Sequence, residues 1–295
     1  MSFLSLLQTK RLIVGDGAMG TRLMDMGLPP GECAGLWNLE RPEDVLRVHR
    51  EYVEAGSDLL LTNTFGAGPL VLARHGVEAK CERIHAAGVE LARCAADGRA
   101  AVVGDISATG RLIEPLGDLS EDGAFASFRR QAAALAGAGA DALIFETFES
   151  SAELKLALRA ARDCCDLPLM ACMTFRSEPG GRYRSIMGEG PESLVRMAVE
   201  CGCAVVGTNC GQGISTMAPL VKQIAELADG RIPVIVEPNA GLPQLVAGRT
   251  VYREDPSVFR GYVPELYAAG ARIIGGCDGT TAEHVRVIRA FADVV

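Results

Sequence analysis

The 295-residue chain contains few aromatic residues, only four histidines and no block of basic residues. Its formal net charge of −8 argues against nucleic-acid binding, which requires lysine and arginine clustered on one face. No apolar run reaches the length of about 18 residues that a membrane span needs. The first 12 residues lack the basic segment of a secretory signal and are predicted to form a capping helix of the fold. These absences indicate a cytoplasmic globular protein that binds neither nucleic acid nor a membrane.

The ten cysteines occur without a secretion signal, which favours a reducing compartment over a disulfide framework. Most of them are predicted to be small buried side chains with no chemical role. This interpretation covers Cys33, Cys81, Cys94, Cys164, Cys165, Cys172, Cys201 and Cys203. Cys210 and Cys277 differ from these because each ends a predicted strand.

Short apolar runs rich in β-formers alternate with longer amphipathic segments, which is typical of successive βα units around a parallel sheet. Several amphipathic segments end in glycine just before the next apolar run, as helix C-caps do. The eight strand candidates are residues 11–21, 58–65, 100–107, 142–148, 167–175, 204–210, 232–241 and 272–279. Eight such units without a linker predict one α/β domain over residues 1–295, a single (β/α)8 TIM barrel.

Polar residues follow the apolar runs, and in such a barrel the carboxyl ends of the strands carry the active site. These candidates are Asp16, Asn63, Asp105, Glu146, Asn209, Cys210, Glu237, Asn239, Cys277 and Asp278. For Asp105, Glu237 and Asn239 a structural role remains an alternative, either as helix caps or as partners of buried backbone groups.

The ends of the sixth and eighth strands carry a possible metal site. Cys210 in "GTNCGQG" and Cys277 in "GGCDG" are close enough across a barrel mouth to share an ion, and Asp278 is a possible third ligand. The glycines at 275, 276 and 279 free the backbone to turn both side chains toward one point. Such a site suits Zn²⁺ with a fourth position open for catalysis. The alternative is a glycine-rich phosphate cradle in which the thiols are incidental.

Several motifs resemble the homocysteine S-methyltransferase family, and most of all the homocysteine-binding module of cobalamin-dependent methionine synthase. The resemblance runs in order from about residue 8 to residue 292. Its motifs are "GDGAMGT" (15–21), "TNTF" (62–65), "FETF" (145–148), "TNCGQG" (208–213), "VEPNAGLP" (236–243) and "GGCDGTTAEH" (275–284).

This resemblance implies a barrel in which zinc binds the thiol of homocysteine. The family's ligands are a cysteine after strand six and a Cys-Cys pair after strand eight. Cys210 and Cys277 match two of them, whereas Asp278 replaces the last cysteine. The amino-acid end of the substrate is implied to lie near Asp16, Gly17 and Ala18 of the first loop and near Glu146. A salt bridge at the barrel mouth is the alternative role for Glu146.

Zinc coordination would remove the thiol proton, so no general base is required, and all four histidines are predicted in helical segments. The methyl donor is expected from outside, either as a small sulfonium or betaine or on a separate corrinoid (methylcobalamin) protein. Three functions follow. The chain is a zinc-dependent enzyme that methylates homocysteine to methionine, a corrinoid-linked methyltransferase or demethylase whose changed substrate is marked by Asp278, or a metal-free binding subunit.

Overall fold

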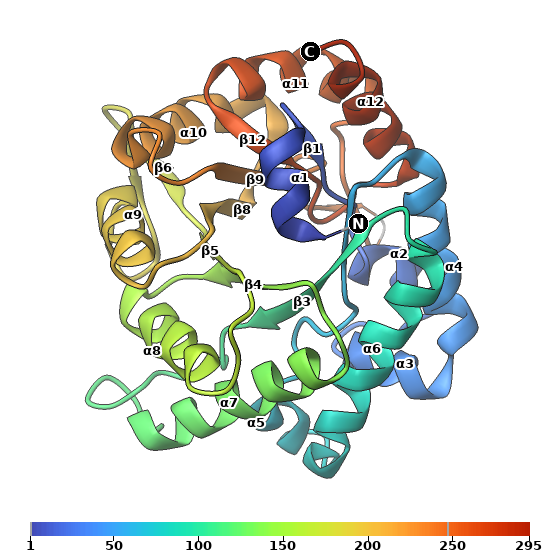
Figure 1. Ribbon diagram of the computed structural model, residues 1–295, viewed down its shortest axis with the longest axis vertical. Helices are drawn as coiled ribbons and strands as arrows, with labels where there is room; N and C mark the ends of the chain where they lie inside the picture. Colours follow the sequence, from blue (N-terminus) through green and yellow to red (C-terminus); the bar gives the residue numbers. More distant parts are fainter. Residues whose placement is uncertain (1, 247) are drawn as a thin grey trace.

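Eight parallel strands form a barrel in the computed structural model, which describes residues 2–246 and 248–295 (Figure 1). Around the barrel the strands follow the order β1-β12-β9-β8-β5-β4-β3-β2. The prediction of a (β/α)8 barrel is confirmed. The strands are β1 (Ile13–Val14), β2 (Leu59–Leu61), β3 (Ala101–Ser107), β4 (Ala142–Phe148), β5 (Leu169–Met173), β8 (Val205–Gly213), β9 (Val234–Asn239) and β12 (Ala271–Ile274).

Helices surround the strands and cover the outside of the sheet (Figure 1). Their apolar faces pack on the strands in one large core, while the opposite faces carry the charged residues. The helices are α1 (Phe3–Thr9), α2 (Gly20–Asp25), α3 (Trp37–Glu40), α4 (Pro42–Ala55), α5 (Pro69–Ala73), α6 (Cys81–Ala96), α7 (Glu121–Gly137), α8 (Ser151–Arg162), α9 (Pro191–Glu200), α10 (Ile214–Ala228), α11 (Pro256–Ala268) and α12 (Ala282–Ala292), with the 3-10 turns η1 (Ala34–Leu36) and η2 (Glu78–Lys80).

Two aspartates join β1 to β2, the first and last strands of this order. The backbone N–H of Asp58 donates to the carbonyl of Val14 at 2.7 Å. The Asp58 carboxylate accepts from the Val14 N–H at 3.0 Å, and the Asp16 carboxylate accepts from the Leu61 N–H at 2.9 Å. Side-chain bonds therefore replace ladder bonds here, and the barrel is closed.

The amino-terminal end of the barrel is sealed by α1. Phe3 and Leu6 of this helix are 1% exposed and pack against the side chains that fill the barrel interior, among them Ile13, Leu59 and Ile235. Ser2 caps the helix by accepting from the Ser5 N–H. The predicted capping helix is confirmed, and it leaves the carboxyl-terminal mouth as the open end.

Two antiparallel hairpins extend the loops at the mouth and were not predicted. One pairs β6 (Arg176–Glu178) with β7 (Arg182–Arg184), and the other pairs β10 (Gln244–Val246) with β11 (Arg249–Val251). They follow β5 and β9 in the chain. Most of their residues are polar, so the continuous apolar runs that identify the barrel strands are absent from them.

Three smaller findings concern the remaining predictions. Cys94 is exposed, because it lies on the solvent face of α6, so its prediction as a buried thiol is wrong. His75 lies in the turn after α5 and not in a helix. Among the described residues, none of the helices combines the length and the apolar character needed to cross a membrane.

Candidate active site

The ends of β4 and β8 are distorted in the same way and bonded to each other. Thr147 and Cys210 are non-glycine residues with left-handed backbones, at φ 58° and φ 57°, and Gly211 follows at φ 70°. The Asn209 side chain accepts from the Thr147 N–H at 2.8 Å and donates to the Thr147 hydroxyl at 2.7 Å. A left-handed non-glycine residue costs of order 1–2 kcal/mol, so these cross-strand bonds hold a strained geometry. Cys210 is thereby positioned at the barrel mouth.

Cys277 and Asp278 lie in the loop that follows β12. The strand ends at Ile274, so the alternation of side chains along a strand does not apply to them. The loop is anchored on both sides: the Gly276 N–H donates to the Asp16 carbonyl, and the Cys277 N–H donates to the Pro238 carbonyl, both at 2.8 Å. These bonds fix Cys277 between the first loop and β9.

The predicted role of the glycines in this loop is only partly correct. Gly279 has the expected positive φ of 79°, but Gly275 and Gly276 do not have a positive φ. Gly276 is needed for space instead, because a Cβ there would lie 2.5 Å from the Thr280 hydroxyl oxygen. Close packing, rather than left-handed backbone, explains that glycine.

The three predicted metal ligands converge. Ligand atoms of Cys210, Cys277 and Asp278 all lie within 4.8 Å of one another. Tetrahedral zinc, with Zn–S bonds near 2.3 Å, places two sulfur ligands about 3.8 Å apart, so the cluster has the dimensions of a zinc site. The Asn239 side-chain amide donates to the Cys210 sulfur at 3.7 Å, an outer contact of the kind that orients metal ligands.

The two thiols differ in how readily they lose a proton. A hydrogen bond from Cys277 lowers the pKa of Cys210 to about 7 against the opposing effect of burial. The same hydrogen bond, together with burial, raises the pKa of Cys277 well above its usual range. Burial also raises the pKa of Asp278. The protein alone therefore holds one thiolate readily, and a cation is required to hold two thiolates and a carboxylate together.

All seven predicted site residues line one cavity of about 350 Å³ in the mouth of the barrel. The predicted metal ligands and the predicted substrate-binding residues therefore share the same cavity. The predicted residues are Asp16, Gly17, Ala18, Glu146, Cys210, Cys277 and Asp278. The structure thus brings together residues from both ends of the sequence, which the strand order of the barrel makes possible.

The first loop is held by internal bonds. The Ala18 N–H donates to the Thr280 hydroxyl at 3.0 Å, and the Tyr52 hydroxyl donates to the Ala18 carbonyl at 2.6 Å. A Cβ on Gly17 would lie 2.8 Å from the Tyr52 ring. Glycine at this position lets the loop pack against Tyr52, and the loop is rigid before any ligand arrives.

The cavity is strongly acidic. None of the described residues that line it is lysine, arginine or histidine, whereas five are aspartate or glutamate. Burial raises the pKa of Asp16 to about 8. Burial and the nearby Cys210 and Asp16 raise the pKa of Glu146 to about 8. None of the described lining residues offers a cation to these carboxyl groups, so a bound cationic group would favour their ionised form.

Two residues of the site were missed at the level of sequence. Thr147 is part of the strained pair described above, and Tyr252 has its ring against Gly279, where any Cβ would overlap it. Thr147 is β-branched, which disfavours a left-handed backbone, so the sequence carried no signal for its geometry. Tyr252 follows the β10–β11 hairpin, which was not predicted either.

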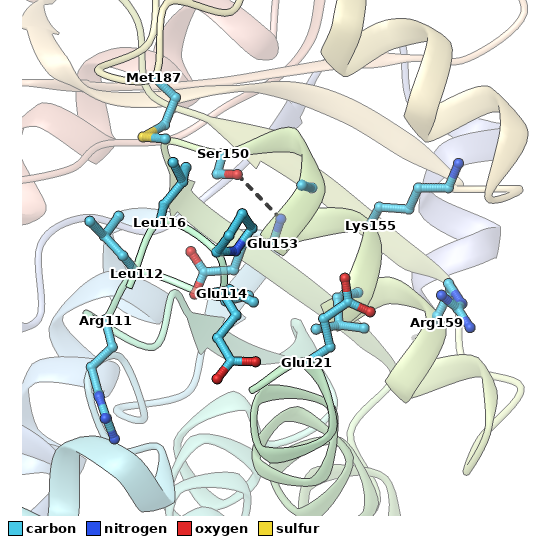
Figure 2. Close-up of a pocket in the computed structure, with 14 residues that line it drawn as sticks. Arg111, Leu112, Glu114, Leu116, Glu121, Ser150, Glu153, Lys155, Arg159 and Met187 are labelled. Atoms are coloured by element: carbon cyan, nitrogen blue, oxygen red, sulfur yellow. Dashed lines mark hydrogen bonds between the residues drawn. The ribbon is translucent and has the colours of Figure 1, made fainter. Parts of the chain in front are cut away.

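A second cavity of about 370 Å³ is a groove between the loop after β3 and the start of α8 (Figure 2). The side chains of Leu112 and Leu116 that line it are 54% and 65% exposed. Ser150 caps α8 by accepting from the Glu153 N–H, the dashed bond in Figure 2. No cysteine is among the described residues that line this groove.

Known proteins are similar to this chain over nearly its whole length. The chain is 30% identical to the methionine synthases of Mycobacterium leprae and Mycobacterium tuberculosis, over 97% and 96% of its length. It spans only 25% of the length of either.

Solved structures of other proteins have the same fold. The homocysteine methyltransferase MmuM from Escherichia coli, in its metallated form, is 24% identical with a TM-score of 0.80, covering 97% of this chain and 98% of that one. Its oxidized form is 25% identical with a TM-score of 0.80, covering 98% of each chain. The family model described as homocysteine S-methyltransferase matches residues 13–292. The chain therefore belongs to the homocysteine S-methyltransferase family.

Proposed function

We propose that this protein transfers a methyl group from an external donor to the thiol of homocysteine, giving methionine. Zinc would be held by Cys210, Cys277 and Asp278 in the barrel mouth. The observation that carries the proposal is the convergence of these three ligand atoms, within 4.8 Å of one another, in a cavity of a chain that belongs to this family. We also propose that residues 1–295 work as one barrel domain.

Zinc in this position would deprotonate the substrate thiol, whose thiolate is the nucleophile, at neutral pH. The chain's own residues hold and orient the ligands. Asn239 donates to the Cys210 sulfur, and the bonds between Asn209 and Thr147 keep Cys210 in its strained conformation. A general base is not needed, which agrees with the lack of histidine among the described cavity residues.

The amino-acid end of the substrate would lie between the first loop and the end of β4. Glu146 offers an acceptor for the ammonium group, and Asp16, Gly17 and Ala18 line the same cavity. The Ala18 N–H is already bonded to Thr280, so this loop contributes a fixed wall more than a free donor at that position. A rigid wall reduces the entropy lost when the substrate is oriented.

Asp278 is expected to change the reactivity of the site relative to three cysteines. Its carboxylate neutralises zinc as a thiolate does, but oxygen donates less charge than sulfur. The metal would be the stronger Lewis acid, so the substrate thiol would lose its proton at a lower pH. A second candidate function, in which the substrate is another methylated compound, is favoured by this residue alone.

The methyl donor would be carried by a separate corrinoid protein that docks at the mouth. The chain is 30% identical to a methionine synthase over 97% of its length, and the groove beside the mouth exposes Leu112 and Leu116. Replacing Leu116 by Ser should slow transfer from a corrinoid protein and leave transfer from a small sulfonium unchanged. Equal slowing with both donors, or no slowing with either, would contradict docking at this groove.

The test of the proposed function combines elemental analysis with homocysteine-dependent methyl transfer. We expect one zinc per chain, reduced zinc and activity in Asp278→Ala, and retained zinc with a shifted pH dependence in Asp278→Cys. Full zinc content and full activity in Asp278→Ala would remove Asp278 as a ligand. A protein without zinc and without homocysteine binding would overturn the proposal and favour a binding subunit.

A further inference from the structure

A closed ring of hydrogen bonds includes the loop that follows β12. The Ala240 N–H donates to the Asp278 carbonyl at 2.8 Å, and the Glu254 N–H donates to the Ala240 carbonyl at 2.9 Å. His284 Nε2 donates to the Glu254 carbonyl at 3.0 Å. The Thr281 N–H donates to His284 Nδ1 at 3.1 Å. Because Thr281 lies three residues after Asp278, these bonds and the chain between the two residues close the ring.

The imidazole of His284 supplies two neighbouring links of this ring, whereas the other links join backbone groups. His284 is the third residue of α12 and is 5% exposed. Its ring packs edge-on against Phe259 of α11, with centroids 4.6 Å apart and an angle of 76° between the planes. Burial and this packing hold the imidazole in one orientation, so both nitrogens face fixed partners.

The partners of the two nitrogens determine which nitrogen carries the hydrogen. The Glu254 carbonyl can only accept, so Nε2 must carry it. The Thr281 N–H can only donate, so Nδ1 must be bare. The Thr281 hydroxyl lies 3.0 Å from Nδ1 and donates to it in this state. The ring of hydrogen bonds therefore requires a neutral His284 with its hydrogen on Nε2.

The ring encloses the turn that carries the last two proposed metal ligands. Asp278 belongs to the ring through its carbonyl, and Cys277 directly precedes it. Within the turn, the Cys277 carbonyl accepts from the Thr280 hydroxyl at 2.7 Å. From outside, the Tyr252 ring packs on Gly279, and Tyr252 belongs to the same segment as Glu254. Opening the ring at His284 would free this segment and the start of α12 from each other.

We propose that His284 is a positioning residue for Cys277 and Asp278, and that it acts only as the neutral imidazole with hydrogen on Nε2. It works through Thr281 and Glu254 and not through a bond to either ligand side chain. The inference rests on the proposed function, because the position of these ligands matters only if a metal binds there. A turn that is already ordered loses less conformational entropy when its side chains bind a metal.

The charges around His284 agree with a neutral ring at neutral pH. Burial lowers its pKa, while the bond to the Glu254 carbonyl and the carboxyl groups of Asp255 and Glu283 oppose this effect. Glu283 is itself paired with Arg286 on the same helix. The Glu254 carboxyl group is bonded to the Ser215 hydroxyl of α10. Protonation of the imidazole would put a hydrogen on Nδ1, and the Thr281 N–H would lose its acceptor.

Two substitutions open the ring at different links. Asparagine keeps an acceptor near the position of Nδ1, and glutamine keeps a donor near the position of Nε2. Zinc affinity is measured by competition with a chelating dye near neutral pH. His284→Asn and His284→Gln should each weaken zinc binding about 10-fold, the lower end of the range for losing an outer-shell partner, because either opening breaks the same ring.

His85→Asn is the matched control. His85 is fully buried, and its Nδ1 is bonded to the Cys81 carbonyl within α6, outside the ring. This variant should keep the zinc affinity of the unsubstituted protein, measured at a temperature where it is folded. A weakening as large as that of the His284 variants would show that loss of any buried histidine has this effect, and would overturn the proposal.

Nitrogen NMR of the imidazoles tests the tautomer directly. The chain has four histidines, so the signal that disappears in His284→Asn identifies His284. We expect a neutral ring with hydrogen on Nε2 at neutral pH. As the pH falls, the affinity difference between the unsubstituted protein and His284→Asn should narrow where NMR shows the ring becoming protonated, since asparagine does not titrate. Protonation without narrowing would contradict the proposal.

Three results separate the alternatives. Unchanged zinc affinity in both His284 variants, or hydrogen on Nδ1, would overturn the positioning role and leave the proposed function intact. Normal affinity in His284→Asn with a loss in His284→Gln would limit His284 to capping α12, which also overturns the role of the ring. If the unsubstituted protein bound no zinc, the proposed function would fail and the positioning role with it.

Discussion

The two ends of this barrel treat buried charge in opposite ways. At the amino-terminal end, Phe3 and Leu6 seal an apolar interior, and Asp58 is neutralised by Lys10 and Arg289. At the carboxyl-terminal end, the same strands lead to carboxyl groups without cations and to Cys210 in a strained backbone. The amino-terminal end therefore stabilises the fold, whereas the carboxyl-terminal end gives up stability for binding. Substitutions at the first end should change mainly stability, and substitutions at the second should change mainly binding and activity.

The largest effect is expected from the metal ligands. Cys277→Ala removes one of three ligands, so zinc binding and methyl transfer should fall by at least about 100-fold, beyond the range for losing an outer-shell partner. Cys172→Ala is the control, because Cys172 is fully buried in the apolar interior of the barrel.

The Cys172 variant should lose some stability and keep its zinc. Zinc content by elemental analysis and methyl transfer with homocysteine distinguish the two variants. Loss of zinc in Cys172→Ala, or normal zinc in Cys277→Ala, would contradict the division between the two ends.

Asp58→Asn should destabilise the fold by about 2 kcal/mol, because it leaves Lys10 and Arg289 without their shared counter-charge. The value lies below that of a fully buried pair, since the Lys10 and Arg289 side chains are 29% and 22% exposed. Urea unfolding at neutral pH measures it. Methyl transfer by the folded variant should be normal, and a selective loss of activity would assign Asp58 to the site.

The acids of the mouth should make stability fall as the pH rises. Burial raises the pKa of Asp16 and Glu146 to about 8 in the folded protein, so between their ordinary values and pH 8 the folded state binds protons that the unfolded chain has released. The free energy of unfolding then decreases through this window, by up to about 1.4 kcal/mol per pH unit for each group.

Glu146→Gln should make this decrease shallower. Unfolding of the chelated protein by urea between pH 5 and pH 8 provides the comparison, because bound zinc would add its own pH dependence. Identical pH profiles for Glu146→Gln and the unsubstituted protein would show that Glu146 is ionised throughout, contrary to its burial.

The smallest effect is expected from Asp105→Asn, and it has the opposite sign to that of Asp58→Asn. Removing an acid that lacks a partner should raise the stability of the substrate-free protein by about 1 kcal/mol or less near pH 8. Urea unfolding measures the difference. A loss of stability as large as that of Asp58→Asn would show that Asp105 has a structural role.

Most of the barrel could be predicted from the sequence, because parallel strands buried on both faces have continuous apolar runs that end abruptly. The range 142–148 matches β4 at both ends, while 11–21 contains a strand of only two residues, Ile13–Val14. The polar residues after it belong to the first loop, whose conformation depends on Thr280 and Tyr52 and not on its own periodicity.

The residues that form the site could be predicted from the sequence, but their arrangement in space could not. Cys210, Cys277 and Asp278 stand at strand ends beside glycine, and the structure brings them together. The strain at Cys210 depends on a contact between Asn209 and Thr147, 62 residues apart. Likewise, Asp58 and Asp105 both adjoin apolar runs. Only the fold reveals that Arg289, 231 residues from Asp58, pairs with Asp58, and that Asp105 Oδ1 has no hydrogen-bond partner among the described residues.

We infer that the mouth holds one zinc through two sulfurs and one carboxylate and binds the substrate thiol there. X-ray absorption at the zinc edge counts sulfur donors directly. We expect two sulfur donors in the protein alone, from Cys210 and Cys277, and three after homocysteine is added. A sulfur count that stays the same on addition of homocysteine, or a purified protein that binds no zinc, would contradict it.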